Sequence, residues 1–176
     1  MLRCKQYLSV DWRPIDQGAF QASFLNATNA DTLRAVLAVE HAAMEHGEEP
    51  PGLGLELQRL ESKVDLLTRL VGQLVAKDLG IPPPTEVVLG VGDIEWIAET
   101  APVVGQSILV VLYPSPMYPL TVRLQGLVEQ LTKTGERYRI KVRFAEINES
   151  VGEHLERLIF ILHRRQVAQT RKGDDA

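Results

Sequence analysis

The residues best suited to bind an anion are three cations in the stretch RYRIKVRF, residues 137–144. Arg139, Lys141 and Arg143 occupy alternate positions, and in a β-strand alternate side chains lie on the same face. An arginine donates two parallel hydrogen bonds to a phosphate or carboxylate, so this face could hold a nucleotide or an acidic protein surface. The same pattern is more often the solvated outer face of a barrel strand.

A second group of cations lies near the end of the chain, in a predicted helix. The partial negative charge of a helix C-terminus favours cations there whether or not they bind a ligand. We therefore treat five residues together as one candidate patch for a nucleotide or a protein partner. They are Arg139, Lys141, Arg143, Arg164 and Arg165.

No spacing typical of an enzyme or a metal centre occurs in the sequence. Cys4 is the single cysteine, and no two histidines have the H-x-x-x-H spacing of a zinc site. The stretch GVGDIE, residues 90–95, has two glycines of a dinucleotide-binding motif but lacks the third. We expect no catalytic residue, no metal and no cofactor. The four histidines are His41, His46, His154 and His163.

Composition and charge exclude further classes of protein. The 176 residues carry a formal net charge of −4, which argues against binding a nucleic acid polymer by counterion release. A single cysteine cannot form an internal disulfide, which is typical of a reducing compartment. No run of about 18 uninterrupted apolar residues occurs, so no membrane span is predicted. We expect a soluble cytoplasmic protein.

A heptad pattern runs through residues 53–75, where apolar residues recur at alternating steps of four and three. Such a pattern forms one apolar ridge along a helix, and a helix of this length is marginal in water unless the ridge is covered. The a positions are Leu57, Val64 and Val71, and the d positions are Leu53, Leu60, Leu67 and Leu74.

The ridge widens in its second half, where Leu66, Leu70 and Val75 are also apolar. A two-stranded coil would leave these side chains exposed, whereas a four-helix arrangement would cover more of them. Valine at a with leucine at d favours dimers, so the two indications differ, and we favour a homotetramer over a dimer. The alternative is an amphipathic helix that packs on its own domain. The expected oligomerisation residues are Leu53, Leu57, Leu60, Val64, Leu67, Leu70, Val71 and Leu74.

Two segments with prolines divide the chain. HGEEPPGLG, residues 46–54, separates a first helix from the heptad helix, which is expected at about 53–79. LGIPPP, residues 79–84, ends that helix because three successive prolines cannot be helical. We place the domain boundary there, with an N-terminal helical region at 1–83 and a β-barrel with a closing helix at 84–176.

The first helix is predicted to begin at an N-cap, Asn29 or Asp31, and to end at about His46. Residues 1–28 are ambiguous, with QYLSVDW as a candidate short strand. The apolar face of the first helix is expected to comprise Leu33, Val36, Leu37, Ala43 and Met44.

After residue 84 the apolar period changes to two, which predicts strands. EVVLGVGDIEWIAE and QSILVVLY are strand-like, and two more strands flank a Thr-Gly turn at residues 134–135. Gly126 is expected at a bulge. An antiparallel meander without helices between its strands predicts a small barrel, and the chain as a whole an α+β fold.

Buried positions of this predicted barrel follow from the same periods. The strand face opposite the three cations holds Ile140, Val142 and Phe144. Trp12 and Trp96 are expected in the core or an interface. Residues 149–166 are expected to form the closing helix, with a buried stripe of Leu155, Leu158, Ile159 and Leu162.

Residues 84–172 resemble the PilZ family, small β-barrels that in many bacterial proteins bind cyclic di-GMP. The resemblance rests on four stretches together: GQSILVVLY, LTVRLQGLVEQL, YRIKVRFAEIN and ESVGEHLERLIFILHRRQ. With the preceding heptad helix, the chain resembles the atypical tetrameric PilZ proteins of xanthomonads. That resemblance implies a barrel displayed on a helical bundle.

The ligand motifs that this resemblance implies are degenerate here. The segment KDLGIPPPTEVVLG should hold an R-x-x-x-R pair but has no arginine. In DIEWIA, which aligns with D/N-x-S-x-x-G, Asp93 matches, whereas Glu95 replaces the serine and Ala98 replaces the glycine. Each charge-assisted hydrogen bond lost is worth roughly 1.5–3 kcal/mol, so binding should weaken by orders of magnitude. Arg139 and Arg143 also form R-x-x-x-R, but they lie too late in the chain to be this motif.

We therefore expect a non-enzymatic regulatory protein that acts by protein–protein interaction and is made multivalent by its heptad helix. The resemblance implies a process linked to cyclic di-GMP, such as pilus function, motility or virulence, with the usual nucleotide site lost and an unidentified protein partner. The alternative is a cyclic di-GMP receptor that uses the unconventional basic patch.

Overall fold

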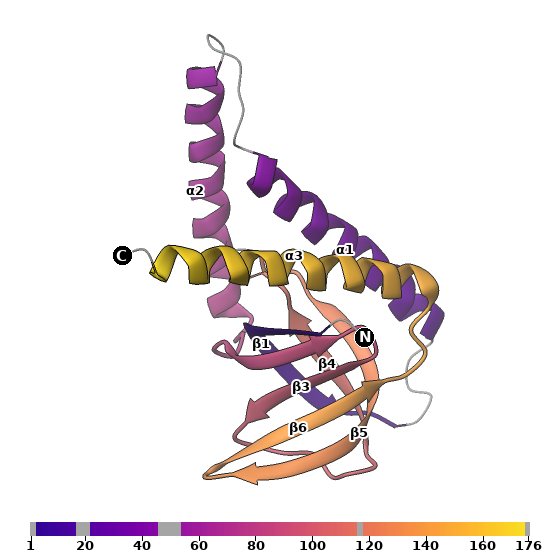
Figure 1. Ribbon diagram of the computed structural model, residues 1–176. Helices are drawn as coiled ribbons and strands as arrows, with labels where there is room; N and C mark the ends of the chain where they lie inside the picture. The colour runs from indigo at the N-terminus through magenta and orange to yellow at the C-terminus, as the bar shows by residue number, and fades with distance from the viewer. Residues whose placement is uncertain (1–2, 17–21, 46–53, 116–117, 175–176) are drawn as a thin grey trace.

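A computed structural model describes residues 3–16, 22–45, 54–115 and 118–174. It contains three helices and six strands in these ranges (Figure 1). In chain order they are β1 (Arg3–Pro14), α1 (Ala22–Glu45), α2 (Gly54–Asp78), β2 (Thr85–Gly90), β3 (Asp93–Ala98), β4 (Ser107–Tyr113), β5 (Val122–Thr134), β6 (Arg137–Phe144) and α3 (Glu149–Asp174).

The six strands form a closed antiparallel barrel in the order β1-β2-β3-β6-β5-β4. The ring closes because β1 is long enough to pair twice: its first half pairs with β2 and its second half with β4. This confirms the predicted α+β fold with antiparallel strands. The prediction that residues 1–83 are a helical region is wrong for Arg3–Pro14, which supplies a barrel strand. Its short polar-apolar alternation was too weak a signal without the two partner strands.

The strand order is not the predicted meander. β3 pairs with β6, and β4 pairs with β1 and β5, so β3 and β4 are consecutive in sequence but not neighbours in the sheet. The connection between them, residues 99–106, crosses to the other side of the ring. This order is possible because β1 closes the ring and becomes the second neighbour of β4, on the side opposite β5.

The barrel interior is filled from alternate strand positions. Ile140 and Val142 are fully buried and Phe144 nearly so, whereas the cations between them face outward, as predicted. Trp96 on β3 is also buried in this core, and Trp12 packs partly buried against it.

Gly126 on β5 is required by close packing and not by a bulge. A Cβ atom at this position would overlap the Val142 side chain and lie 2.7 Å from the carbonyl oxygen of Arg143. The register shift between β5 and β6 occurs instead between Val128 and Gln130. The predicted bulge at Gly126 is therefore wrong. A glycine within a strand can mark either a bulge or the close approach of a neighbouring strand, and here it marks the second.

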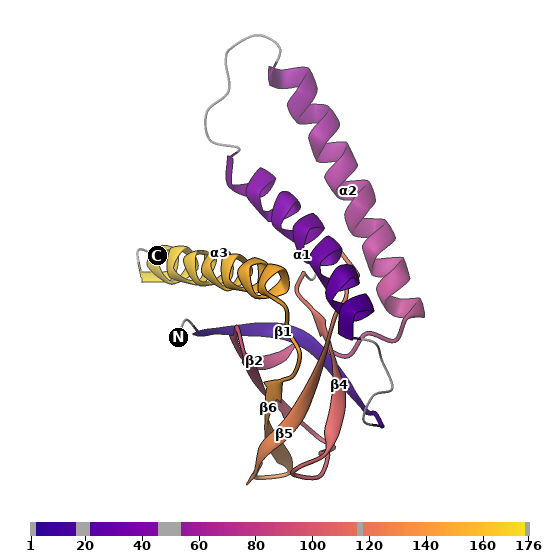
Figure 2. The same cartoon turned by 90° about the vertical axis from the view of Figure 1, so that its right-hand side faces the viewer.

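Helices α1 and α3 cover one end of the barrel (Figure 2). The predicted stripe of α3, comprising Leu155, Leu158, Ile159 and Leu162, is buried. The helix continues beyond the predicted end at Gln166 to Asp174. On α1, Leu33, Val36 and Leu37 are buried as predicted, whereas the side chains of Ala43 and Met44 lie outside the described part of the structure.

Two asparagines of α1 fasten that helix to the barrel. The Asn29 amide donates to the Arg123 carbonyl oxygen at 2.7 Å and accepts from the Arg123 N–H at 2.9 Å. One turn earlier, Asn26 donates to the Glu146 carbonyl oxygen at 2.7 Å and accepts from the Asn148 N–H at 3.4 Å. Because α1 begins at Ala22, the predicted N-cap at Asn29 or Asp31 is wrong. Asn29 satisfies strand backbone rather than the end of its own helix.

Helix α2 stands away from the rest of the molecule (Figures 1 and 2). Among the described elements it packs extensively against none of the others. It ends at Asp78, and Gly80 then adopts a left-handed conformation with φ of 61°, as glycine after a helix often does. The proline segment at 82–84 follows and leads into β2.

A pair of glycine substitutions tests the packing at β5. We expect Gly126→Ala to lower the free energy of unfolding by about 1–3 kcal/mol, because the added methyl group meets a side chain and a backbone carbonyl. The matched control is Gly152→Ala on α3, whose Cβ would lie 3.9 Å from Val91, an ordinary contact. In a helix this change should be neutral or stabilise by up to about 1 kcal/mol. Urea unfolding at fixed protein concentration measures both, and equal effects would contradict the close approach.

Candidate functional site

The cations of β6 lie on the outer face of the barrel, between the acidic side chains of the neighbouring strands. The sheet register places β3 on one side of β6 and β5 on the other. Arg139 binds Glu95 of β3 through Nη1 and Oε1 at 2.7 Å, and its Nη2 lies 3.8 Å from Glu86 of β2. The hydrogen bond to Glu95 raises the pKa of Arg139 above its ordinary value.

The same pattern continues in both directions across the sheet. Lys5 of β1 contacts Glu86 at 2.8 Å, and this hydrogen bond lowers the pKa of Glu86. On β5, Glu129 lies 3.0 Å from Arg143 and 3.8 Å from Lys141. We call this set the charge ladder. It comprises Lys5, Glu86, Glu95, Arg139, Lys141, Arg143 and Glu129.

The charge ladder nearly neutralises itself, with four cations against three carboxylates. Each of the three predicted patch residues on β6 therefore already contacts an anion. A phosphate group would have to displace a carboxylate from Arg139 or share it with Glu95 and Glu86. Like charges at such distances repel, so the ladder disfavours an anionic ligand on this face.

Asp93 and Ala98 begin and end β3. One carboxylate oxygen of Asp93 binds the Arg3 guanidinium at 2.9 Å. The other oxygen is buried against Gly90 and has no hydrogen-bond partner among the described residues. Ala98 pairs across the sheet with Tyr138. Of the three motif positions, only Glu95 takes part in the charge ladder, and it does so as the counterion of Arg139.

The predicted patch does not form one surface. Helix α3 packs on α1, β1 and β2 rather than on β6. Arg164 on α3 lies over the Phe160 ring, 5.9 Å from its centroid. The side chain of Arg165 lies outside the described residues.

The apolar ridge of α2 is exposed to solvent along its length. Leu60, Leu67 and Leu74 at the d positions expose 59%, 62% and 66% of their surface. The exposed apolar residues of the helix are Leu57, Leu60, Val64, Leu66, Leu67, Leu70, Val71 and Leu74, and the predicted Leu53 lies outside the described residues. Exposed apolar clusters of this size mark interaction surfaces.

The burial of one α2 glycine shows where that helix meets the rest of the protomer. Gly72 is buried, at the foot of the helix, whereas its neighbour Val71 is exposed. Gly72 is the one b position of α2 in the described residues that is buried, so the helix meets the rest of the protomer near this residue, while the a and d positions stay exposed. The protomer cannot cover the ridge in this orientation.

Nothing in the sequence indicated directly which carboxylates pair with the β6 cations. Glu86 and Glu129 are two ordinary strand carboxylates, and only the register brings them to Arg139, Lys141 and Arg143. A weak signal was present in the alternation of Glu86 and Glu95 with buried residues in neighbouring strands. Lys5 could not have been found, because β1 was not assigned to the barrel.

The described residues contain no cluster of three or more histidine, cysteine, aspartate or glutamate side chains that could hold a metal ion. No helix in these ranges combines the length and the apolar character needed to cross a membrane.

Comparison with known protein families shows a match over most of the chain. The family model of the atypical PilZ domain, described as a cyclic di-GMP receptor, matches residues 33–172. A comparison with curated protein sequences gives no significant match.

Comparison with solved structures also finds similar proteins. A tetrameric PilZ protein of Xanthomonas campestris, described as self-assembled through an unusual helical bundle, is 29% identical with a TM-score of 0.72. The match covers 95% of this chain and 90% of that one. The PilZ domain of Escherichia coli YcgR with cyclic di-GMP is 17% identical, with a TM-score of 0.42, 51% of this chain covered and 79% of that one. The Bacillus subtilis motility inhibitor MotI/DgrA is 16% identical, with a TM-score of 0.38, 48% of this chain covered and 42% of that one.

A double-mutant cycle measures whether the charge ladder is an energetic unit. We expect Glu95→Gln and Arg139→Gln to show a coupling of about 0.5–1 kcal/mol in urea unfolding, and this coupling should fall as salt is added. The control cycle is Asp31→Asn with Arg34→Gln, an exposed pair within α1 at 2.8 Å. Its coupling should be at most about 0.3–0.5 kcal/mol. Zero coupling between Glu95 and Arg139 would show that the ion pair does not hold the guanidinium.

Proposed function

The chain belongs to the atypical PilZ domain family, and on that premise we propose that it is a non-enzymatic regulatory protein that assembles with copies of itself through α2. The observation that carries the proposal is the exposed apolar ridge of that helix. A regulatory barrel repeated in one assembly gains apparent affinity for a repeated partner without any new contact.

A second copy of this chain is the occupant that suits the ridge. Exposed leucines at d positions and valines at a positions are side chains that interdigitate when identical helices from two copies of a chain pack together. Burying a leucine stabilises by roughly 1.5–3 kcal/mol, so several in a row are enough to drive association. The related Xanthomonas protein, alike over nearly its whole length, is described as a tetramer assembled through a helical bundle.

The width of the ridge favours a tetramer over a dimer. Leu66 and Leu70 flank the a and d positions and are themselves about half exposed. A pair of helices would leave both in water, whereas a four-helix arrangement buries flanking positions as well. The narrow half of α2 is distal, and the wide half lies toward the barrel. We propose that four copies meet most closely at the wide half.

The charge ladder supports loss of the usual cyclic di-GMP site. The segment before β2 has no arginine, and Glu95 occupies the place of a small hydroxyl residue and pairs with Arg139. The β6 cations that could bind a phosphate group are therefore already paired with carboxylates of the same sheet. We propose that the protein acts in the cytoplasm by binding a protein partner, in a process linked to cyclic di-GMP such as pilus function, motility or virulence.

A second candidate function is direct binding of cyclic di-GMP at an unconventional basic site. The description of the family as a cyclic di-GMP receptor favours it, as does the one excess positive charge of the ladder. The residues that would contact the nucleotide are either Arg139, Lys141 and Arg143 on β6 or Arg164 and Arg165 on α3, since the two groups do not form one surface.

Two aspartates on the ridge test self-assembly. We expect Leu60→Asp with Leu67→Asp to reduce the mass of the particle to that of a protomer, because a buried unpaired carboxylate costs several kcal/mol. The control, Gln58→Asp with Ser62→Asp, adds the same charge at exposed positions off the ridge and should keep the assembly. Sedimentation velocity measures both, and an unchanged mass of the ridge variant would refute the register.

Calorimetric titration with cyclic di-GMP separates the two candidate functions. We expect no saturable heat at micromolar nucleotide and modest salt. Glu95→Ser with Glu86→Gln frees Arg139 from its carboxylates, so this variant should gain weak binding if the ladder is what blocks the face. Micromolar binding by the unaltered protein, lost in Arg139→Ala, would instead establish the receptor function.

A further inference from the structure

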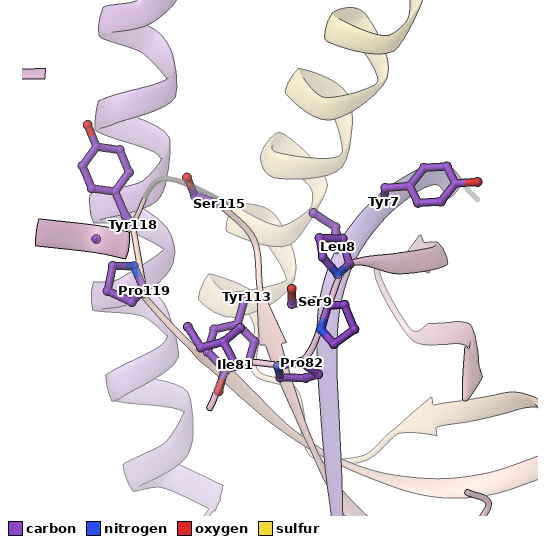
Figure 3. A pocket seen from close by; sticks show the side chains of 12 residues that line it. Tyr7, Leu8, Ser9, Ile81, Pro82, Tyr113, Ser115, Tyr118 and Pro119 are labelled. Atoms are coloured by element: carbon purple, nitrogen blue, oxygen red, sulfur yellow. The ribbon is translucent and has the colours of Figure 1, made fainter. Parts of the chain in front are cut away.

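A cavity of about 250 Å³ lies at the foot of α2, where that helix meets the barrel (Figure 3). Its walls come from segments far apart in the sequence. Tyr7 and Ser9 belong to β1, Gly72 to α2, and Tyr113 to the end of β4. The prolines at 82–84 and the segment at 118–119 complete it. Figure 3 shows Tyr118 and Tyr7 on opposite sides of the lining, with Tyr113, Ile81 and Ser9 between them.

The lining combines rigid rings with hydroxyl groups and carries no charge. Three tyrosines and four prolines supply the rings. None of the described lining residues is acidic or basic, so the cavity offers a nucleotide or other anion no counterion. Tyr7 exposes 71% of its surface, so one end is open to solvent. These features suit an uncharged ligand that presents flat apolar surfaces and acceptor oxygens.

A proline-rich segment in the polyproline II conformation has those properties. Its rings stack on aromatic side chains, and its carbonyl oxygens are unpaired acceptors because the helix has no internal hydrogen bonds. Proline has no N–H to offer, so the receptor must donate, and tyrosine and serine hydroxyls can do so. Because Tyr118 and Tyr7 lie at opposite sides of the lining, an extended chain suits the cavity better than a compact ligand.

Tyr113 lines the cavity at the end of β4 and is partly buried. Burial raises its pKa above the ordinary tyrosine value, and the nearby charge of Asp11 adds to this, while Arg123 acts in the opposite direction. The phenol therefore keeps its proton to a higher pH than an exposed tyrosine.

We propose that this cavity is a docking site for an uncharged proline-rich segment of a partner protein. The inference rests on the proposed role in protein–protein interaction and gives the partner a chemical class. Because Gly72 lies on α2 while Tyr113 and Ser9 lie on the barrel, the bound segment contacts both parts. The bound segment therefore bridges α2 and the barrel at the foot of the helix.

The probe is acetyl-decaproline amide, titrated into the full chain and followed by tyrosine fluorescence and calorimetry. We expect saturable binding of one peptide per chain, and no binding of a neutral glycine-serine peptide of the same length. Tyr118→Ala should weaken binding about tenfold through loss of a stacking ring. Tyr113→Phe, which removes only a hydroxyl, should weaken it about threefold. Phe24→Ala, at an exposed aromatic residue of α1 outside the cavity, should leave binding unchanged.

The outcomes separate this proposal from that of self-assembly. Sedimentation should show Tyr118→Ala with the mass of the unaltered protein, and the Leu60→Asp, Leu67→Asp variant should bind the peptide as well as the unaltered protein does. No saturable binding, equal binding of the glycine-serine peptide, or insensitivity to Tyr118→Ala would overturn the docking site. Peptide binding by the dissociated variant alone would overturn it too, because the cavity would then be covered in the assembly. A monomeric unaltered protein that still binds the peptide would instead refute assembly alone.

Discussion

The backbone pairing of β1 with both β2 and β4 is the constraint on which the remaining features depend. It closes the ring and removes the free edges that an open sheet would present. The same strand supplies Lys5 to the charge ladder, Tyr7 and Ser9 to the cavity, and Gln6 to a hydrogen bond with the Leu162 carbonyl of α3. Displacement of β1 would therefore open the barrel and disturb both surfaces at once.

On the outer face of the barrel, a run of cations is paired with carboxylates without being buried. Arg139, Lys141 and Arg143 remain partly or largely exposed, yet carboxylates from both neighbouring strands contact them. Such pairs add little to stability in water, and under the proposed loss of the nucleotide site they serve to occupy these cations. An incoming phosphate meets Glu95 and Glu86 as competitors already in place.

Helix α2 connects assembly and recognition through its two faces. Its a and d face is apolar and exposed, whereas its b face meets the rest of the protomer near Gly72. Under the functions proposed here, copies of the chain cover the first face and a partner segment contacts the foot of the helix beside the second. The two events use different residues, so each can occur without occluding the other.

The local periods of the sequence were enough to predict the heptad helix, the strands after residue 84 and the buried stripe of α3. Each of these is a repeat within one segment, and its burial follows from geometry alone. The family resemblance was likewise carried by local stretches, and the substitutions at Glu95 and Ala98 could be seen without coordinates. What the sequence could not decide depended on contacts between distant segments. Arg3–Pro14 becomes a strand only by pairing with two strands that lie about 80 and about 100 residues further along the chain, and Asn29 serves a strand backbone instead of its own helix. The counterions of the β6 cations and the cavity beside α2 were decided by tertiary structure alone, because strand register sets which charges and rings meet and no single segment contains it.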